Sequence, residues 1–356
     1  MFLVSLNYFR AIAIVLIVAG HCYNLVGIHA ETLIEKTLIN ILTGGTSLFV
    51  FISGFLFHHI FYSRYKYMKF MKGKVKNVLV PYFLLSIPII YWYILKNDGW
   101  LPYFMPQGTG ILDEVIIPTL KYYWTGAAMT AYWYIPFIMV TFALSPLHIL
   151  FIRQKTTVQV IGTMCLVVIA IFLQRPLHNY LVLQSVLYFM PVYLIGIFSS
   201  IHREKIYQLL ERKELILLVM VIILAGVQAY FVSNEGYHKA PFEYGGIDIM
   251  FLQKIILSFF FLIFLHRFEG TQSKILDIIA STSFAIFFIH GYLKYSGMKV
   301  MSAIGIQNLS NLALFEGSSQ WIVLIVAVLV ITTLCILMAL MIKKILPKYS
   351  RYLIGY

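Results

Sequence analysis

The sequence predicts an all-α integral membrane protein, a bundle of about ten transmembrane helices in a single domain over residues 1–356. Of the 356 residues, 61% are hydrophobic and only 12% are charged, and the mean hydropathy is +0.86. Apolar runs long enough to cross a bilayer, roughly 20 residues, recur along the chain. Basic residues gather in particular connections between these runs, which is typical of a multi-pass membrane protein.

The apolar runs define the individual helices. We expect helices at 9–28, 38–60, 78–96, 131–151, 157–173, 183–200, 214–232, 248–266, 275–294 and 319–342. Clusters of Lys and Arg follow the second, sixth and tenth of them, at 64–76, 203–213 and 343–351. The positive-inside rule assigns these clusters to the cytoplasm, so both termini are expected there. This topology explains the net charge of +13, and no nucleic-acid partner is expected.

The connections on the opposite side carry most of the acidic residues. These are Glu31, Glu35, Asp98, Asp113, Glu114, Glu235, Glu243, Asp248 and Glu316. The longest connection, at 98–130, is rich in Gly, Pro and aromatic residues, among them Trp100 and Trp124. Long loops are usually functional, and aromatic side chains stack on sugar rings. An aromatic belt at the membrane interface is the favoured interpretation.

Two ionisable residues, Arg10 and His21, lie inside the first expected helix. Such residues cost several kcal/mol in an apolar span unless they are paired or solvated, so they indicate function. Eleven helical steps return to within about 20° of the start and rise about 16 Å. The two side chains therefore share one face at different depths. This arrangement suits a long ligand with a charged head and a reactive tail, with the imidazole as proton acceptor.

The basic run at 69–76, which leads to Pro81 and Tyr82, is a second candidate site. Clustered ammonium groups bind the phosphates of nucleotide-like ligands, but they also arise from topology and attraction to anionic membrane lipids. Ser53, which precedes Gly54, lies in a stretch that favours close helix packing and also offers a hydroxyl to a cavity.

Three further residues lie near expected helix ends. Tyr132 and Trp133 open the fourth helix and His290 is near the end of the ninth. Interfacial positions explain all three, and a role at an acceptor site is the alternative. The spacing of His and acidic residues predicts no metal site, and three scattered cysteines predict no disulfide framework.

Taken together, these residues resemble the acyltransferase-3 family of membrane acyltransferases over nearly the whole chain. The most specific match is a basic residue, ten residues and a histidine in the first helix, here Arg10 and His21. Further matching segments are 49–55, the basic run before Pro81-Tyr82, 145–147, 188–196 and 283–290. The chain is most similar to the branch that modifies exopolysaccharide or biofilm polysaccharide. It departs from many relatives by having Lys74 and Asn77 where they carry Arg-x-x-Arg.

The resemblance implies an enzyme of the bacterial inner membrane that moves an acyl group, most often acetyl, from cytoplasmic acyl-CoA to a sugar hydroxyl. His21 is then a general base or an acyl relay, with the general base favoured, and Arg10 assists it. The expected donor-binding residues are Arg10, Lys72, Lys74, Lys76, Tyr82 and Ser53. The expected acceptor-binding residues are Tyr132, Trp133 and His290. Acyl-CoA is the only expected cofactor-like molecule, with no metal.

The expected partners are a polysaccharide or lipid-linked glycan acceptor, membrane lipids and other exopolysaccharide-synthesis proteins. The competing hypothesis is a polysaccharide or lipid-linked sugar exporter, in which Arg10 and His21 line the pathway. An exporter needs a continuous polar route, and the fifth, seventh and tenth expected helices contain few polar residues. Acyl transfer is therefore the favoured function.

Overall fold

The expected all-α membrane bundle is confirmed. The computed structural model describes residues 3–96, 102–231, 238–243, 245–312 and 319–356. Within these residues, eight helical spans are long and apolar enough to cross a membrane, and two bent pairs bring the number to as many as ten. Two of the eight spans, Leu33–Arg64 and Tyr67–Lys96, each consist of several consecutive elements. Asp98, Trp100, Glu235 and Glu316, which figured in the predicted acidic and aromatic loops, lie outside the described residues.

The helices follow one another with short connections. They are α1 (Val4–Val26), α2 (Leu33–Leu42), α3 (Thr46–Leu56), α4 (Tyr67–Lys74), α5 (Val80–Lys96), α6 (Ile117–Thr125), α7 (Tyr134–Ala143), α8 (Ser145–Ile152), α9 (Thr156–Leu173), α10 (Val182–Ile201), α11 (Arg203–Leu210), α12 (Glu214–Phe231), α13 (Ile249–His266), α14 (Lys274–Ala303), α15 (Gln320–Ile345) and α16 (Ser350–Ile354). Single π or 3-10 turns are η1 (Phe57–Phe61), η2 (Tyr62–Arg64), η3 (Val75–Leu79), η4 (Pro102–Phe104), η5 (Leu112–Ile116), η6 (Leu177–Asn179) and η7 (Leu309–Asn311). Two short strands, β1 (Arg175–Pro176) and β2 (His238–Lys239), pair in parallel.

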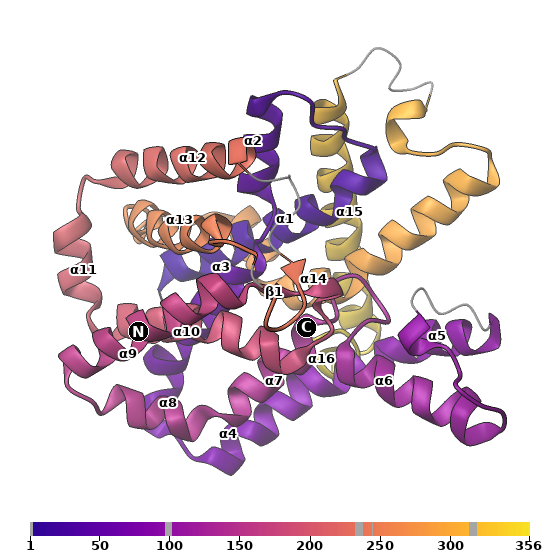
Figure 1. Ribbon diagram of the computed structural model, residues 1–356, viewed down its shortest axis with the longest axis horizontal. Coiled ribbons are helices and arrows are strands. Elements are labelled where there is room, and N and C mark those ends of the chain that lie inside the picture. Colours follow the sequence, from indigo (N-terminus) through magenta and orange to yellow (C-terminus); the bar gives the residue numbers. More distant parts are fainter. Residues whose placement is uncertain (1–2, 97–101, 232–237, 244, 313–318) are drawn as a thin grey trace.

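Helix α1 lies near the centre of the bundle, where α2, α3, α13, α14 and α15 all pack against it (Figure 1). Its apolar side chains Phe9, Ile14 and Val18 are completely buried. Burial of a Phe or Ile side chain contributes about 1.5–3 kcal/mol in water, and in a membrane the same close packing acts through van der Waals contact. The polar residues of α1 are thus held in fixed positions inside the protein.

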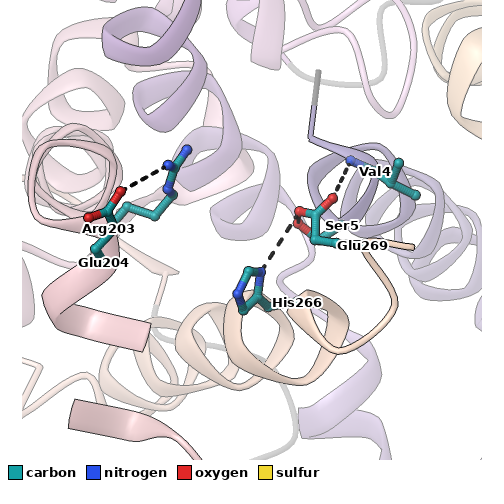
Figure 2. A network of polar contacts seen from close by, with 6 residues as sticks. All are labelled: Val4, Ser5, Arg203, Glu204, His266 and Glu269. Carbon is teal, nitrogen blue, oxygen red and sulfur yellow. Dashed lines mark hydrogen bonds and ion pairs between the residues drawn. The ribbon is translucent and has the colours of Figure 1, made fainter. Parts of the chain in front are cut away.

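The N-terminal end of α1 is held by a carboxylate. Glu269, just after α13, accepts hydrogen bonds from the backbone N–H of Val4, at 2.8 Å, and from the hydroxyl of Ser5 (Figure 2). His266 approaches the same carboxylate at 3.9 Å. Negative charge at a helix N-terminus is stabilising because the first N–H groups have no partners within the helix. The contact fixes the depth of α1 against α13.

Helices α3 and α10 approach closely because each presents a glycine at the crossing. A Cβ on Gly54 would lie 2.0 Å from the carbonyl oxygen of Tyr193, and a Cβ on Gly196 would lie 2.1 Å from that of Phe51. Small residues allow such close approach of transmembrane helices. The close helix packing predicted for this stretch is confirmed at Gly54.

A break between α2 and α3 is stabilised by a buried lysine. The ammonium group of Lys254, on α13, donates to the carbonyl oxygens of Asn40 and Ile41 at 2.9 and 2.8 Å. These carbonyls end α2, where cations are favourable. Gly44 follows with a φ of 74°, a backbone conformation that suits glycine. The span expected at 38–60 therefore lies within one apolar segment, Leu33–Arg64, which is interrupted by the turn between α2 and α3.

Two other expected helices are bent. The helix expected at 131–151 is the pair α7 and α8, which meet at 55° because Pro146 cannot continue the hydrogen bonds of α7. The helix expected at 275–294 is α14, which extends to Ala303 and bends by 72° at Thr282. The Thr282 hydroxyl donates to the Ile278 carbonyl at 2.7 Å, a contact that favours bending.

The long connection at 98–130 contains structure of its own. It includes α6, and Phe104 stacks on Tyr122 with ring centroids 4.4 Å apart. Tyr122 also stacks on Tyr93 of α5, at 5.3 Å. Phe104 and Tyr122 are buried, whereas Trp124 is exposed. Part of the aromatic content of this loop thus forms a small core rather than a belt.

Candidate active site

Arg10 lies on α1 against the bend of α14. Its Nη2 donates to the carbonyl oxygen of Ala280 at 2.5 Å, two residues before the bend at Thr282. The buried Nε of Arg10 has no hydrogen-bond partner in the described residues. A guanidinium has five N–H donors, so most of the donor capacity of Arg10 remains for a ligand.

Arg10 lines a large cavity with many positive charges, which we call the basic cavity. Its volume is about 520 Å³, within the range of ligand pockets. The cations in its wall are Arg10, Arg64, Lys66, Lys69, Lys74 and Arg351. Its lining residues include no carboxylate. The charge and size suit a ligand with several phosphates.

The basic cavity is assembled from segments far apart in the sequence. Phe61, in the π turn η1, and Asn77, in the π turn η3, form part of its wall. Single π turns are frequent at functional sites because they displace side chains from the regular helical position. Arg351, on α16, approaches from the C-terminal end of the chain.

A smaller cavity of about 240 Å³ adjoins the basic cavity and shares Arg10 and Lys74 with it. Ser53 lines this smaller cavity, where most of the wall is apolar. The ammonium group of Lys74 lies over aromatic rings, 4.3 Å from the ring centre of Phe142 and 4.7 Å from that of Phe61. Cation–π contacts hold the Lys74 charge in place without an acidic partner.

A narrow neck of about 20 Å³ leads from the basic cavity toward His21. Ser283 and Phe284, just after the bend of α14, line both the basic cavity and the neck. His21 and Trp133 line the other end of the neck. The buried hydroxyl oxygen of Ser283 has no hydrogen-bond partner among the described residues. The neck thus lies between the cavity that contains Arg10 and the cavity that contains His21, and it shares lining residues with both.

His21 stacks on His290 of α14. Their ring centroids are 5.4 Å apart and the ring planes differ by 25°. His290 is 1% exposed, and its Nδ1 lies 2.9 Å from the Ile286 carbonyl oxygen. Because a carbonyl only accepts, Nδ1 carries the proton and Nε2 of His290 is left as an acceptor without a partner in the described residues. The stacking fixes the plane of the His21 ring.

Beyond the neck lies a second large cavity, which we call the His21 cavity. Its volume is about 340 Å³. One wall is the α2–α3 turn with Thr43 and Thr46, and another is formed by Arg175 and His238 of the two strands. Burial, and then the positive charge of Arg175, lowers the pKa of His238 to about 3, so this ring is neutral. Its Nδ1 donates to the Pro176 carbonyl oxygen at 3.1 Å.

The other predicted site residues occupy different places. Trp133 lines the neck, the His21 cavity and a further cavity. Tyr132 is completely buried and its hydroxyl donates to the Phe288 carbonyl oxygen at 3.0 Å. The Tyr82 hydroxyl donates to the Tyr123 carbonyl oxygen at 2.8 Å. Neither tyrosine is in the wall of these cavities.

Two of the predicted donor-binding lysines face away from the basic cavity. Lys72 and Lys76 are exposed and do not line it. The ammonium group of Lys76 lies 4.6 Å from the ring centre of Tyr352. Four cations that line the basic cavity were not among the expected donor-binding residues: Arg64, Lys66, Lys69 and Arg351. All four belong to the basic clusters that the sequence showed, and Lys69 begins the candidate run at 69–76.

The arrangement brings a cationic binding site and an imidazole to opposite ends of one helix, with a narrow connection between them. No group of three or more His, Cys, Asp or Glu side chains that would hold a metal ion occurs in the part of the chain that the structure describes. The site combines a proton acceptor, His21, with several cations and an apolar neck. These features suit the transfer of a small group between two substrates.

Comparison with known families agrees with this geometry. A family model described as an acyltransferase domain matches residues 3–340. The chain belongs to the acyltransferase-3 family. The comparison with curated proteins gives no match, and neither does the comparison with solved structures. Membership shows an acyltransferase embedded in a membrane by multiple helices. The matched region ends before α16, so Arg351 is a cavity residue outside it.

Proposed function

We propose that this acyltransferase moves an acetyl group from cytoplasmic acetyl-CoA to a sugar hydroxyl of an exopolysaccharide or its lipid-linked precursor. The observation that carries the proposal is the arrangement of Arg10 in the basic cavity and His21 in a separate cavity, with the neck between them. One substrate enters from each end. The neck, at about 20 Å³, has room for little more than a water molecule, far less than a glycan chain needs, which argues against the exporter hypothesis.

The basic cavity is the proposed binding site for the phosphates of CoA. Its six cations offer charge-assisted hydrogen bonds to phosphate oxygens. Arg10 and His21 are separated by about 16 Å along α1, estimated from the helical rise, a span comparable to an extended pantetheine arm. The thioester then lies at the neck, near Ser283, whose hydroxyl is free to donate to the carbonyl oxygen of the acyl group.

His21 is the proposed general base. Its imidazole removes the proton from the acceptor hydroxyl as the hydroxyl oxygen attacks the thioester carbon. The new C–O bond forms, the C–S bond breaks, and the CoA thiolate receives a proton from the imidazolium. His290 holds the His21 ring by stacking, at a centroid distance of 5.4 Å. An acyl-His21 relay is the alternative, and it requires a second half-reaction.

The acceptor is placed in the His21 cavity, where Trp133 offers an aromatic surface to a sugar ring. The positive-inside rule assigns the basic end of the bundle to the cytoplasm, and both Arg10 and Arg351 line the cavity at that end. The protein is accordingly proposed to act in a bacterial inner membrane, beside anionic lipids and other exopolysaccharide-synthesis proteins.

A comparison of two variants tests the proposal. Purified protein in nanodiscs is incubated with radiolabelled acetyl-CoA, first alone to measure equilibrium binding and then with p-nitrophenyl glucoside and glucuronide as acceptors to measure CoA release and labelled glycoside. We expect Arg10→Ala to weaken acetyl-CoA binding, and His21→Ala to retain binding while losing turnover. Label that stays on wild-type protein and not on His21→Ala would favour the relay. The proposal fails if wild-type protein neither binds nor cleaves acetyl-CoA, or if His21→Ala turns it over normally.

A further inference from the structure

Arg175 is a cation in the wall of the His21 cavity that the mechanism has not used. It begins β1, after the residue that ends α9, and lies opposite His238 of β2. Its guanidinium carbon lies 5.2 Å from the ring centre of Trp133. Nη2 donates to Oδ1 of Asn179 at 2.9 Å. This is one hydrogen bond from a group with five N–H donors.

Among the described residues, Arg175 forms no ion pair, and its buried Nε has no hydrogen-bond partner. The acidic groups that act on its charge are the Tyr188 hydroxyl and, after it, the Asp248 carboxylate. That carboxylate already accepts hydrogen bonds from the Tyr188 hydroxyl and the Phe251 N–H, each at 2.8 Å. Asp248 is 1% exposed and does not line the cavity. A buried cation without an ion pair costs free energy unless a ligand supplies the missing hydrogen-bond acceptors.

A neighbouring cavity of about 470 Å³ extends the positively charged space. It shares Thr130, Trp133 and Asn179 with the His21 cavity, and Lys294 lies in its wall. The residues that line these two cavities include no carboxylate. Most of the acidic residues that the structure describes nevertheless belong to the connections on this side, Glu31, Glu35, Asp113, Glu114, Glu243 and Asp248. The interior is therefore selectively positive, opposite in sign to its surroundings.

We propose that Arg175 binds an anionic group of the acceptor, a phosphate or a carboxylate, and so holds the acceptor beside His21; this rests on the proposed acyl transfer. The guanidinium matches either group bidentately. With its sugar ring against Trp133, the acceptor would have its charged end at Arg175 and a hydroxyl facing His21. Arg175 is thus a specificity-determining residue, and an uncharged glycan is a poorer ligand.

Two pairs of probes distinguish the sources of the charge. p-Nitrophenyl β-D-glucuronide is compared with the uncharged glucoside, which tests a carboxylate on the sugar. Farnesyl-phosphate-linked N-acetylglucosamine is compared with the farnesyl glycoside that lacks phosphate, which tests a lipid-linked phosphate. Calorimetric binding is measured in phosphatidylcholine nanodiscs for wild type, Arg175→Gln and Lys239→Gln. Lys239, on β2, does not line the His21 cavity, so it is the matched control.

We expect wild type and Lys239→Gln to bind the charged member of one pair at least about tenfold more tightly, and Arg175→Gln to lose this preference. Acetyl-CoA binding reports whether Arg175→Gln is folded; if it is not, Arg175→Lys replaces it and is expected to lose most of the preference. The proposal is overturned if wild type shows no preference in either pair, or if the folded variant keeps it. Binding of these probes does not depend on turnover. A failure of the Arg175 proposal is therefore distinguished from a failure of the proposed acyl transfer, which is measured by CoA release.

Discussion

Lys69 and Lys72 provide a sharp test of where the donor binds. Both lie on α4, both are exposed, and each loses one positive charge on replacement by alanine. Of these two lysines, only Lys69 lines the basic cavity. A phosphate contact from an exposed lysine is worth about 1 kcal/mol, or about fivefold in Kd. We expect Lys69→Ala to weaken CoA binding about fivefold and Lys72→Ala to change it by less than about twofold.

The assay is calorimetric titration of CoA into each variant in nanodiscs, at low and at high salt. The effect of Lys69→Ala should shrink at high salt, because an exposed charge is screened. Desulfo-CoA, which retains the phosphates, should reproduce the difference, since the thiol takes no part in it. Equal losses for Lys69→Ala and Lys72→Ala would refute the assignment of the basic cavity as donor site.

Three further predictions follow from particular contacts. Arg10→Ala removes a partly buried cation and should weaken acetyl-CoA binding at least about tenfold by calorimetry; unchanged binding would remove Arg10 from the donor site. Gly54→Ala forces a Cβ against the Tyr193 carbonyl oxygen and should cost about 1–3 kcal/mol, seen as a lower thermal midpoint; Gly162→Ala, with open space around its Cβ, is the control. Burial raises the pKa of Asp248 to about 6, so wild type should lose stability as the pH rises from about 4 to about 6; Asp248→Asn should abolish this dependence, and persistence of the slope would contradict the assignment.

The sign of the Asp248 prediction follows from linkage. Below the pKa of about 4 in the unfolded chain, Asp248 is neutral in both states. Between about 4 and 6 the unfolded chain releases the proton while the folded protein retains it, so unfolding is favoured. Above about 6 both states are ionised and the dependence ends.

The sequence predicted the parts of the fold that depend on local pattern. Hydropathy located the spans, and helical periodicity placed Arg10 and His21 on one face of α1. The breaks were harder to predict. The turn between α2 and α3 depends on Lys254, some 210 residues away along the chain, and the bend of α14 depends on a threonine side chain. Neither the Lys254 contact nor the threonine hydrogen bond produces a break in the hydropathy pattern of the span that it bends or interrupts.

The site was predicted only in part, because its remaining residues also depend on contacts that the local sequence pattern does not show. The basic run at 64–76 was recognised from the sequence. Which of its side chains line the basic cavity was not predicted, because the π turns η1 and η3 shift the helical phase there. Arg351 and Arg175 come into the cavities through contacts between distant segments. For Arg175, a signal was present: an arginine directly after an apolar span, on the side where acidic residues prevail.

The central claim is that donor and acceptor reach His21 from opposite ends of the bundle. Inside-out membrane vesicles test it when radiolabelled acetyl-CoA is supplied outside and p-nitrophenyl glucoside and glucuronide are enclosed. The account predicts that labelled glycoside accumulates inside vesicles with wild-type protein and not with His21→Ala. Labelled glycoside that forms only when both substrates are outside, or that forms equally with His21→Ala, would contradict it.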